Sequence, residues 1–156
     1  MIIGDNMEFF IQYDVLFDDP FFPLGPLNLW INGKAYPGKG PNITLSSDMP
    51  DLIAGFKGAL KYNFKQTNLP LDKIDFLDEE YNQTNLLVLT GGELWDNGLS
   101  TLCEIVGETF RLFYSYQEGS YELIELPLAY CKRLTEELEK ELDRICPPRN
   151  YDDEPE

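Results

Sequence analysis

The amino-acid sequence predicts an α+β fold, in which an antiparallel sheet of about six strands carries helices mainly on one face. Two observations predict it. Each half of the chain contains a turn signal between strand-like segments, and each half also contains a segment whose apolar residues recur at three-and-four spacing, as in an amphipathic helix. The element order is then β-β-β-α-(α)-β-β-β-α, with one ambiguous segment in parentheses.

Side-chain type and turn chemistry define the strands of the first half. Residues 9–17 are aromatic and β-branched, which is typical of a strand. Three prolines and a glycine make residues 18–26 a loop. Asn32-Gly33 separates the strand-like residues 27–31 from residues 35–36, and favours a type I′ hairpin because both turn residues need positive φ. We expect these three strands to pair with one another.

A helix follows these strands. Ser47, Asp48 and Pro50 form a typical helix start, and one apolar stripe runs from there to about Phe64. Residues 71–83 are ambiguous between a short helix and an irregular acidic linker, and we favour the helix.

The second half begins with the uninterrupted apolar residues 86–89, which predict a strand buried on both faces. Glycines mark residues 91–98 as a turn-rich loop, and residues 102–106 form a short strand. A second hairpin then joins residues 110–116 to residues 121–126.

The last predicted helix begins at Pro127 and is ended by Pro147-Pro148. Length and a hydrophobic content of 43% favour a single domain over residues 1–148. Residues 149–156 are acidic and nearly devoid of apolar side chains, so we expect a disordered tail.

Charge and composition exclude several classes of function. The chain holds 28 acidic and 12 basic residues and no histidine, for a formal net charge of −16. So negative a charge opposes binding to nucleic acid phosphates and to anionic lipid. The missing histidine excludes Ser-His-Asp and Cys-His nucleophiles and histidine-ligated zinc. We therefore expect a protein partner with a cationic surface, and neither a cofactor nor a metal.

The acidity is concentrated in the second half. Residues 74–131 hold eleven acids and one base, whereas residues 34–73 hold six bases and three acids, with Lys57, Lys61 and Lys65 along one helix edge. The N-terminus lacks a basic-then-apolar leader pattern, and no apolar run reaches the roughly 18 residues of a membrane span. We expect a cytoplasmic protein that does not enter membranes.

The densest acidic cluster lies in the ambiguous segment. Three interpretations stay open for it: a magnesium or calcium site, a landing surface for a basic partner, and a solvated helix face. The segment has neither the glycine nor the ligand spacing of a calcium loop, which argues against a metal. The partner-binding candidates in this segment are Asp75, Asp78, Glu79, Glu80 and Tyr81.

Trp95 and Asp96 form a second candidate, in the glycine-rich loop. Tryptophan is enriched at binding hot spots, and loops often carry function. The ring could equally fold back on the sheet, so both interpretations stay open.

Phe21 and Phe22, which follow Asp18 and Asp19, form a third candidate. They have the same two interpretations, exposure at a binding surface or burial, and we favour burial. Trp30 lies in a strand, and we expect it in the core.

No catalytic motif is present. The glycine spacing matches neither a P-loop nor a dinucleotide fingerprint. Cys103 and Cys131 look like core thiols, since no histidine could activate them. Any two of the 28 carboxylates could meet in space, so a carboxylate-dependent enzyme stays an alternative without a supporting motif.

Short motifs recur in a characteristic order along most of the chain. They are an Ile-Gly-Asp start at residues 3–5, an aromatic strand from Phe9, a Trp-Ile-x-Gly hairpin at residues 30–33 and a Leu-Pro-Leu-x-Tyr helix start at residues 126–130. In this order they resemble bacterial polymorphic-toxin immunity proteins of the immunity protein forty-two type. The resemblance implies a cytoplasmic inhibitor without catalytic residues, which binds and blocks one cognate toxin domain.

Charge and resemblance together predict an immunity protein whose acidic surface binds a cationic toxin, such as a nuclease. The alternative is a DNA-mimic or regulatory protein that occupies the nucleic-acid-binding surface of another protein. Such a mimic should bind several DNA-binding proteins with steep salt dependence, whereas an immunity protein should have one tight partner.

Overall fold

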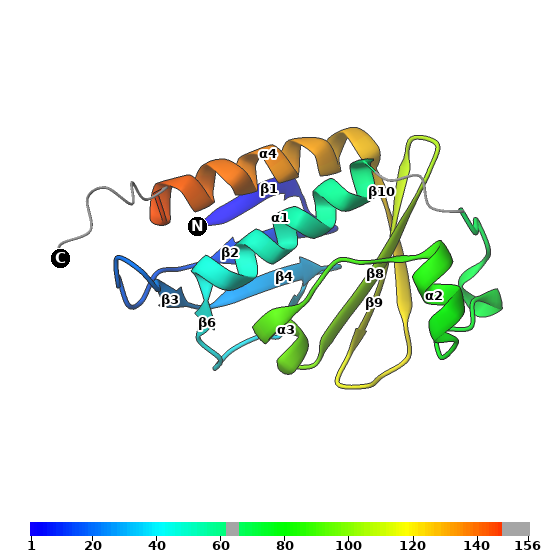
Figure 1. The fold of residues 1–156 in the computed structure, drawn as a ribbon, viewed down its shortest axis with the longest axis horizontal. Helices are drawn as coiled ribbons and strands as arrows, with labels where there is room; N and C mark the ends of the chain where they lie inside the picture. The colour runs from blue at the N-terminus through cyan, green and yellow to red at the C-terminus, as the bar shows by residue number, and fades with distance from the viewer. Residues whose placement is uncertain (62–65, 148–156) are drawn as a thin grey trace.

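The computed structural model describes residues 1–61 and 66–147, which form antiparallel sheets flanked by helices (Figure 1). The first sheet, in the order β1-β2-β4-β5, consists of β1 (Ile2–Asn6), β2 (Phe9–Tyr13), β4 (Leu27–Ile31) and β5 (Lys34–Tyr36). The second, in the order β10-β9-β8-β7, consists of β7 (Leu87–Val88), β8 (Leu99–Val106), β9 (Thr109–Tyr116) and β10 (Glu122–Pro127). A small ribbon pairs β3 (Leu24–Gly25) with β6 (Ile43–Thr44).

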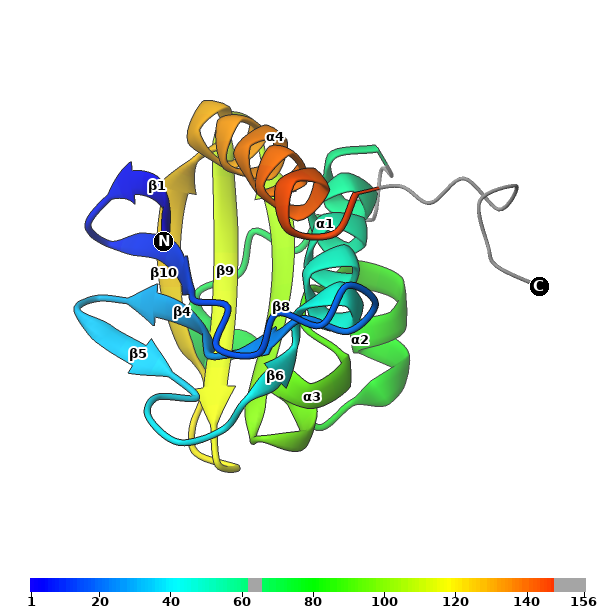
Figure 2. The same cartoon turned by 90° about the vertical axis from the view of Figure 1, so that its left-hand side faces the viewer.

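The helices of the described residues are α1 (Leu45–Lys61), the 3₁₀ helix η1 (Leu71–Lys73), α2 (Glu79–Asn85), α3 (Gly92–Asp96) and α4 (Leu128–Ile145). α1 and α4 lie side by side and contact both large sheets, whereas α2 lies beyond the second sheet (Figures 1 and 2). The predicted α+β class with antiparallel sheets is confirmed.

The strands divide between two four-stranded sheets, where the sequence predicts about six strands in one sheet. The two sheets meet through side chains. The ring of Tyr36 in β5 lies 5.8 Å from the ring of Tyr114 and 5.2 Å from that of Tyr116, both in β9. β5 is three residues long and is followed by Pro37, which has no backbone N–H to continue a ladder.

The hairpin at Asn32-Gly33 is confirmed, with φ of 50° and 82° at the two turn residues. Trp30 is not a core residue. It is half-buried on the outer face of the first sheet, where its ring stacks on Phe10 at 5.6 Å and its Nε1 donates to Gln12 Oε1 at 2.7 Å. The prediction fails because adjacent strand residues point to opposite faces, and the flanking Leu29 and Ile31 take the buried one.

Both long predicted helices are confirmed. α1 begins at Leu45, slightly before the predicted start, and Phe64 and Lys65 at its predicted end lie outside the described residues. The ring of Phe56 in α1 lies 6.4 Å from Phe9 of the first sheet and 5.7 Å from Phe110 of the second. One apolar cluster therefore includes both sheets, α1 and α4.

Residues 86–89 differ from prediction. They contribute only the edge strand β7, and Val88 is exposed, so the prediction of a strand buried on both faces is wrong. Leu86 belongs to an apolar cluster on the outer face of the second sheet, while Leu89 belongs to the main core. An apolar run can thus serve two separate clusters from the edge of a sheet.

Residues 91–98 contain α3, where the sequence predicts a loop. The fully buried carboxylate of Asp48 in α1 accepts hydrogen bonds from the backbone N–H groups of Glu93 at 3.2 Å and Leu94 at 2.8 Å. It satisfies two of the donors that a helix start leaves unpaired. The favoured helix over residues 71–83 is present only in part, as η1 and the start of α2. The predicted disordered tail, residues 149–156, lies outside the described residues.

Candidate functional site

The outer face of the second sheet is covered by the acidic segment, residues 67–86. The ring of Phe76 stacks on that of Tyr121 at 4.2 Å with an interplanar angle of 11°, and lies 5.5 Å from Phe113 of β9. Together with Leu102 and Leu86 these rings belong to an outer apolar cluster, separate from the main core. We call residues 67–86 the cover segment.

A buried ion pair anchors the start of the cover segment. Arg111 and Glu104, on adjacent strands and each about 5% exposed, form a charge-assisted hydrogen bond. The Glu104 carboxylate also accepts hydrogen bonds from Thr67 N at 2.7 Å and Asn68 N at 3.2 Å, and the Arg111 guanidinium donates to the Leu69 carbonyl at 2.6 Å. One feature of the sequence points to this anchor: Arg111 is the one charged residue within the strand-like residues 110–116.

A groove of about 880 Å³ opens where the cover segment, the end of α3 and the turn between β9 and β10 meet. Its apolar lining is aromatic and aliphatic, and much of it faces solvent: Trp95 is 54% exposed and Leu77 is 93% exposed. Buried Ile74 and Leu99 also line it. Exposed apolar side chains gathered in a groove are typical of a binding surface.

The rim of the groove is acidic. Asp75, Asp96 and Glu118 line it, all three are exposed, and neither lysine nor arginine is among the lining residues. Within residues 1–61 and 66–147, none of the three carboxylates forms an ion pair. Asp75 Oδ1 accepts a hydrogen bond from Leu77 N at 3.0 Å. The negative charge of the groove is therefore not neutralised by neighbouring side chains.

Three of the predicted partner-binding residues meet in this groove. Asp75 and the pair Trp95 and Asp96 come from different elements and line it together. Glu118 also lines it, and sequence reasoning missed this residue because nothing in the sequence separates it from an ordinary turn residue.

The other acidic candidates lie on α2, outside the groove lining. Asp78 is the N-cap of α2, and its Oδ1 accepts a hydrogen bond from Tyr81 N at 3.2 Å. Glu79 and Glu80 are exposed in the first turn, where negative charge favours the helix dipole. Tyr81 is half-buried against the outer apolar cluster.

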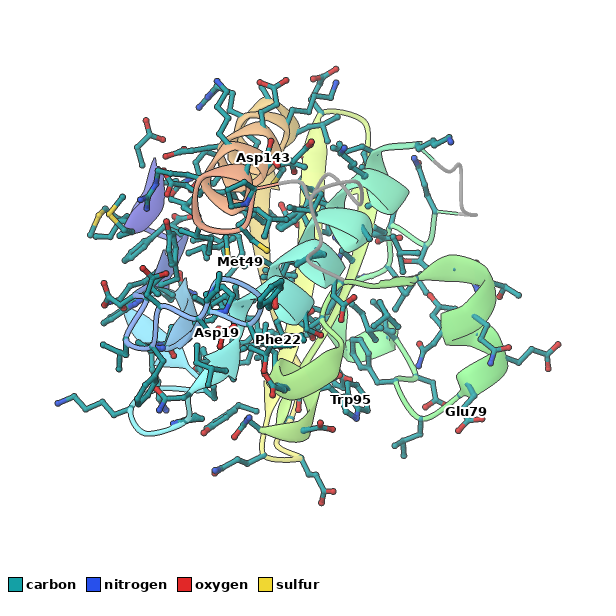
Figure 3. The ribbon with its side chains drawn as sticks, turned by 60° about the vertical axis from the view of Figure 1, so that its left-hand side comes forward. Asp19, Phe22, Met49, Glu79, Trp95 and Asp143 are labelled. Carbon is teal, nitrogen blue, oxygen red and sulfur yellow. The ribbon has the colours of Figure 1, made fainter. Side chains whose placement is uncertain are left out.

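The loop that contains Asp18, Asp19, Phe21 and Phe22 is separate from the groove lining. Asp19 Oδ1 accepts hydrogen bonds from Phe21 N at 2.8 Å and Phe22 N at 2.9 Å, so the acid shapes the turn. Phe21 is 47% exposed and Phe22 63% exposed, and the favoured burial is wrong. The hydrogen bonds to Asp19 hold both residues in a surface turn, and neither ring belongs to the main core. Figure 3 shows Asp19 and Phe22 on one side of Trp95 and Glu79 on the other.

The two core cysteines are buried as predicted. Burial raises the pKa of Cys131 to about 12 and also raises the pKa of Cys103, so both thiols stay protonated at neutral pH. In the part of the chain that the structure describes, no three carboxylate or cysteine side chains gather as a metal site would require. The helices of residues 1–61 and 66–147 include none that is long and apolar enough to span a membrane.

An acidic groove with exposed aromatic and aliphatic side chains is typical of a binding protein. A model of the family described as Immunity protein 42 matches residues 1–141. The chain therefore belongs to the immunity protein 42 family, as its motifs indicate, and this membership supports a toxin-neutralising function.

A solved structure shares the fold. The crystal structure of CdiI from Burkholderia dolosa AUO158 is similar with a TM-score of 0.67 at 20% sequence identity, and the alignment covers 92% of this chain and 99% of that one. A search of curated proteins gives no match.

Proposed function

We propose that this chain is a cytoplasmic immunity protein that binds and neutralises one cognate toxin with a cationic surface, such as a nuclease. The observation that carries the proposal is the groove itself, where unneutralised carboxylates surround exposed apolar side chains in a member of an immunity protein family. Acidic side chains would steer a cationic toxin to the groove, and Trp95 would slow its release.

We propose a graded role for the candidate residues. Asp75, Trp95 and Asp96 form the central contact because they share the groove. The acids of α2, which are Asp78, Glu79 and Glu80, add long-range attraction from beside it, and Tyr81 supports their helix. A second contact lies at the loop of Asp18, Asp19, Phe21 and Phe22, whose exposed rings suit an apolar hollow on the toxin.

Growth rescue tests this assignment. Candidate toxin domains are coexpressed with the wild-type chain, and a domain whose toxicity it abolishes is taken as cognate. A quadruple variant, Asp75→Asn, Glu79→Gln, Glu80→Gln and Asp96→Asn, removes four charges while leaving the Asp78 helix cap in place. We expect it to lose rescue at low expression levels and to bind the toxin at least about 10-fold more weakly.

The matched control removes the same charge elsewhere. Its substitutions are Asp5→Asn, Glu8→Gln, Glu136→Gln and Asp143→Asn, all at exposed positions, and Asp143 lies on α4 away from Trp95 (Figure 3). Full rescue by the Asp75/Glu79/Glu80/Asp96 variant, or an equal loss of rescue in the control, would refute the surface assignment. Tight binding to several unrelated DNA-binding proteins would favour the DNA-mimic alternative instead.

A further inference from the structure

The turn that carries Glu118 has an unfavourable backbone conformation. Gly119 N donates to the Tyr116 carbonyl at 3.1 Å, which closes a four-residue turn with Gln117 and Glu118 at its centre. Their φ values are 52° and 58°, so both adopt the left-handed region that side chains with a Cβ disfavour.

Another turn of this chain has the usual residues at its two positive-φ positions. The turn between β4 and β5 places Asn32 and Gly33 at its two positive-φ positions, and Asn-Gly is the preferred pair there. In the strained turn the nearby glycine is Gly119, which follows the two left-handed residues and does not relieve them. The strain is thus held by Gln117 and Glu118 themselves.

Contacts within the molecule do not account for glutamate at this position. Gln117 N donates to the Gly98 carbonyl at 2.9 Å and fastens the turn, but any residue with a backbone N–H could do so. The side chain of Glu118 is exposed and has neither an ion pair nor a hydrogen bond within residues 1–61 and 66–147. It does, however, line the groove together with Asp75 and Asp96.

We infer that Glu118 is held in this strained turn to contact the bound partner, and that the groove receives an arginine side chain of that partner. The inference rests on the proposed function and adds the chemistry of the contact. Backbone strain of this kind concentrates at binding sites, where the surrounding structure over-determines it.

Arginine fits the lining better than lysine does. Its planar guanidinium can stack on the exposed ring of Trp95 while its several N–H donors reach separate carboxylates, here those of Asp75, Asp96 and Glu118. A lysine ammonium is a compact charge that could satisfy fewer of them at once.

The stability and the toxin affinity of two variants distinguish a partner contact by Glu118 from a purely structural role. In Gln117→Asn/Glu118→Gly the turn acquires its preferred residues, and we expect the midpoint of thermal unfolding to rise by about 2–4 °C. The same variant should bind the toxin identified by growth rescue about 10-fold more weakly. Glu118→Gln should weaken toxin binding without changing the midpoint of thermal unfolding. The control Glu108→Gln removes an exposed charge at the opposite end of β9 and should leave both unchanged.

A second measurement uses defined probes. Capped tri-arginine and tri-lysine peptides are titrated into the full chain at low ionic strength while tryptophan fluorescence is followed. We expect tri-arginine to give a saturable change that Trp95→Phe abolishes, with at least about 3-fold weaker binding by tri-lysine and by Glu118→Gln.

The inference is overturned if Glu118→Gln binds toxin and tri-arginine like the wild type, or if tri-lysine binds as well as tri-arginine. Rescue without these effects would leave the proposed function standing and refute only the arginine contact. Tri-arginine binding by a chain that rescues growth from none of the candidate toxins would support the groove chemistry and count against the proposed function.

Discussion

Gly4 of the Ile-Gly-Asp motif and Tyr130 of the Leu-Pro-Leu-x-Tyr motif lie close together. Gly4 lies in β1 with φ of 97°, and a Cβ at this position would collide with the Tyr130 hydroxyl and lie 2.8 Å from a methyl carbon of Leu134. The Tyr130 hydroxyl donates to the Phe9 carbonyl at 2.5 Å, so it fixes α4 against the first sheet. Gly4 of the Ile-Gly-Asp motif and Tyr130 of the Leu-Pro-Leu-x-Tyr motif therefore have a structural role.

We predict that Gly4→Ala lowers the free energy of unfolding by about 2–4 kcal/mol, because it combines left-handed strain with overpacking. Gly33→Ala is the control. Gly33 has φ of 82° but open space around its Cβ position, so strain alone should cost about 1 kcal/mol. Urea unfolding of both variants measures the difference, and equal losses would contradict the close contact.

Asp48 gives the stability of the protein a defined pH dependence. Its burial, together with the nearby carboxylates of Glu93 and Asp51, raises its pKa above the ordinary value, although the Leu94 and Glu93 backbone donors oppose this. A raised pKa means that the stability this group contributes is present below about pH 4 and is lost as the pH rises through the folded-state pKa.

Asp48→Asn keeps an acceptor oxygen for the start of α3 but cannot ionise. We predict that the variant gains stability relative to the wild type as the pH rises from 4 to 7. Urea unfolding of both proteins at unit pH intervals tests this, because the repulsion among the other charges is common to both. A difference that does not change with pH would argue against the raised pKa.

At the scale of elements, the cover segment depends on the Glu104–Arg111 anchor. We predict that Glu104→Gln lowers the free energy of unfolding by about 3 kcal/mol, since it leaves a buried guanidinium poorly paired. Hydrogen exchange at the amides of Thr67 and Asn68 should accelerate, because both donate to the Glu104 carboxylate.

Glu125→Gln is the matched substitution on the same arginine. Glu125 Oε1 lies 3.6 Å from Arg111 Nε, but its side chain is 59% exposed, so we expect a loss under about 1 kcal/mol. If both variants lose the same stability, the anchor is not the buried pair.

Elements defined by nearby residues could be predicted from the sequence. The Asn32-Gly33 hairpin and the apolar stripe of α4 follow from local turn chemistry and periodicity. α3 could not be predicted, because its first backbone N–H groups are satisfied by the side chain of Asp48, which lies in another helix. The division into two sheets also depends on distant contacts, such as that between Tyr36 and Tyr114.

Only part of the candidate site could be predicted from the sequence. Residue type identified Asp75, Trp95 and Asp96, which line one groove, but could not show that Asp78 caps a helix. Glu118 could not be predicted as a groove residue, because its positive φ cannot be inferred from the residue type.

At the scale of the whole molecule, the net charge of −16 should act on association more than on dissociation. We predict that the association rate constant with the cognate toxin falls at least about 10-fold between 0.05 and 0.5 M NaCl, as screening shortens the reach of the charges. Stopped-flow measurements of both rate constants test it.

Trp95→Ala is the complementary variant. It should raise the dissociation rate constant and leave the salt dependence of association unchanged, since it alters no charge. A salt effect found mainly on dissociation would show that attraction at a distance contributes little.

The separation of the two apolar clusters has a consequence for how such a protein can diversify. Within the groove wall, Ile74, Phe76 and Tyr121 belong to the outer cluster, whereas Leu99 belongs to the main core, which joins both sheets to α1 and α4. Substitutions at the outer-cluster positions therefore exchange few contacts with the main core, and effects at sites without shared partners tend to add. This part of the groove can change in sequence while the scaffold keeps its shape.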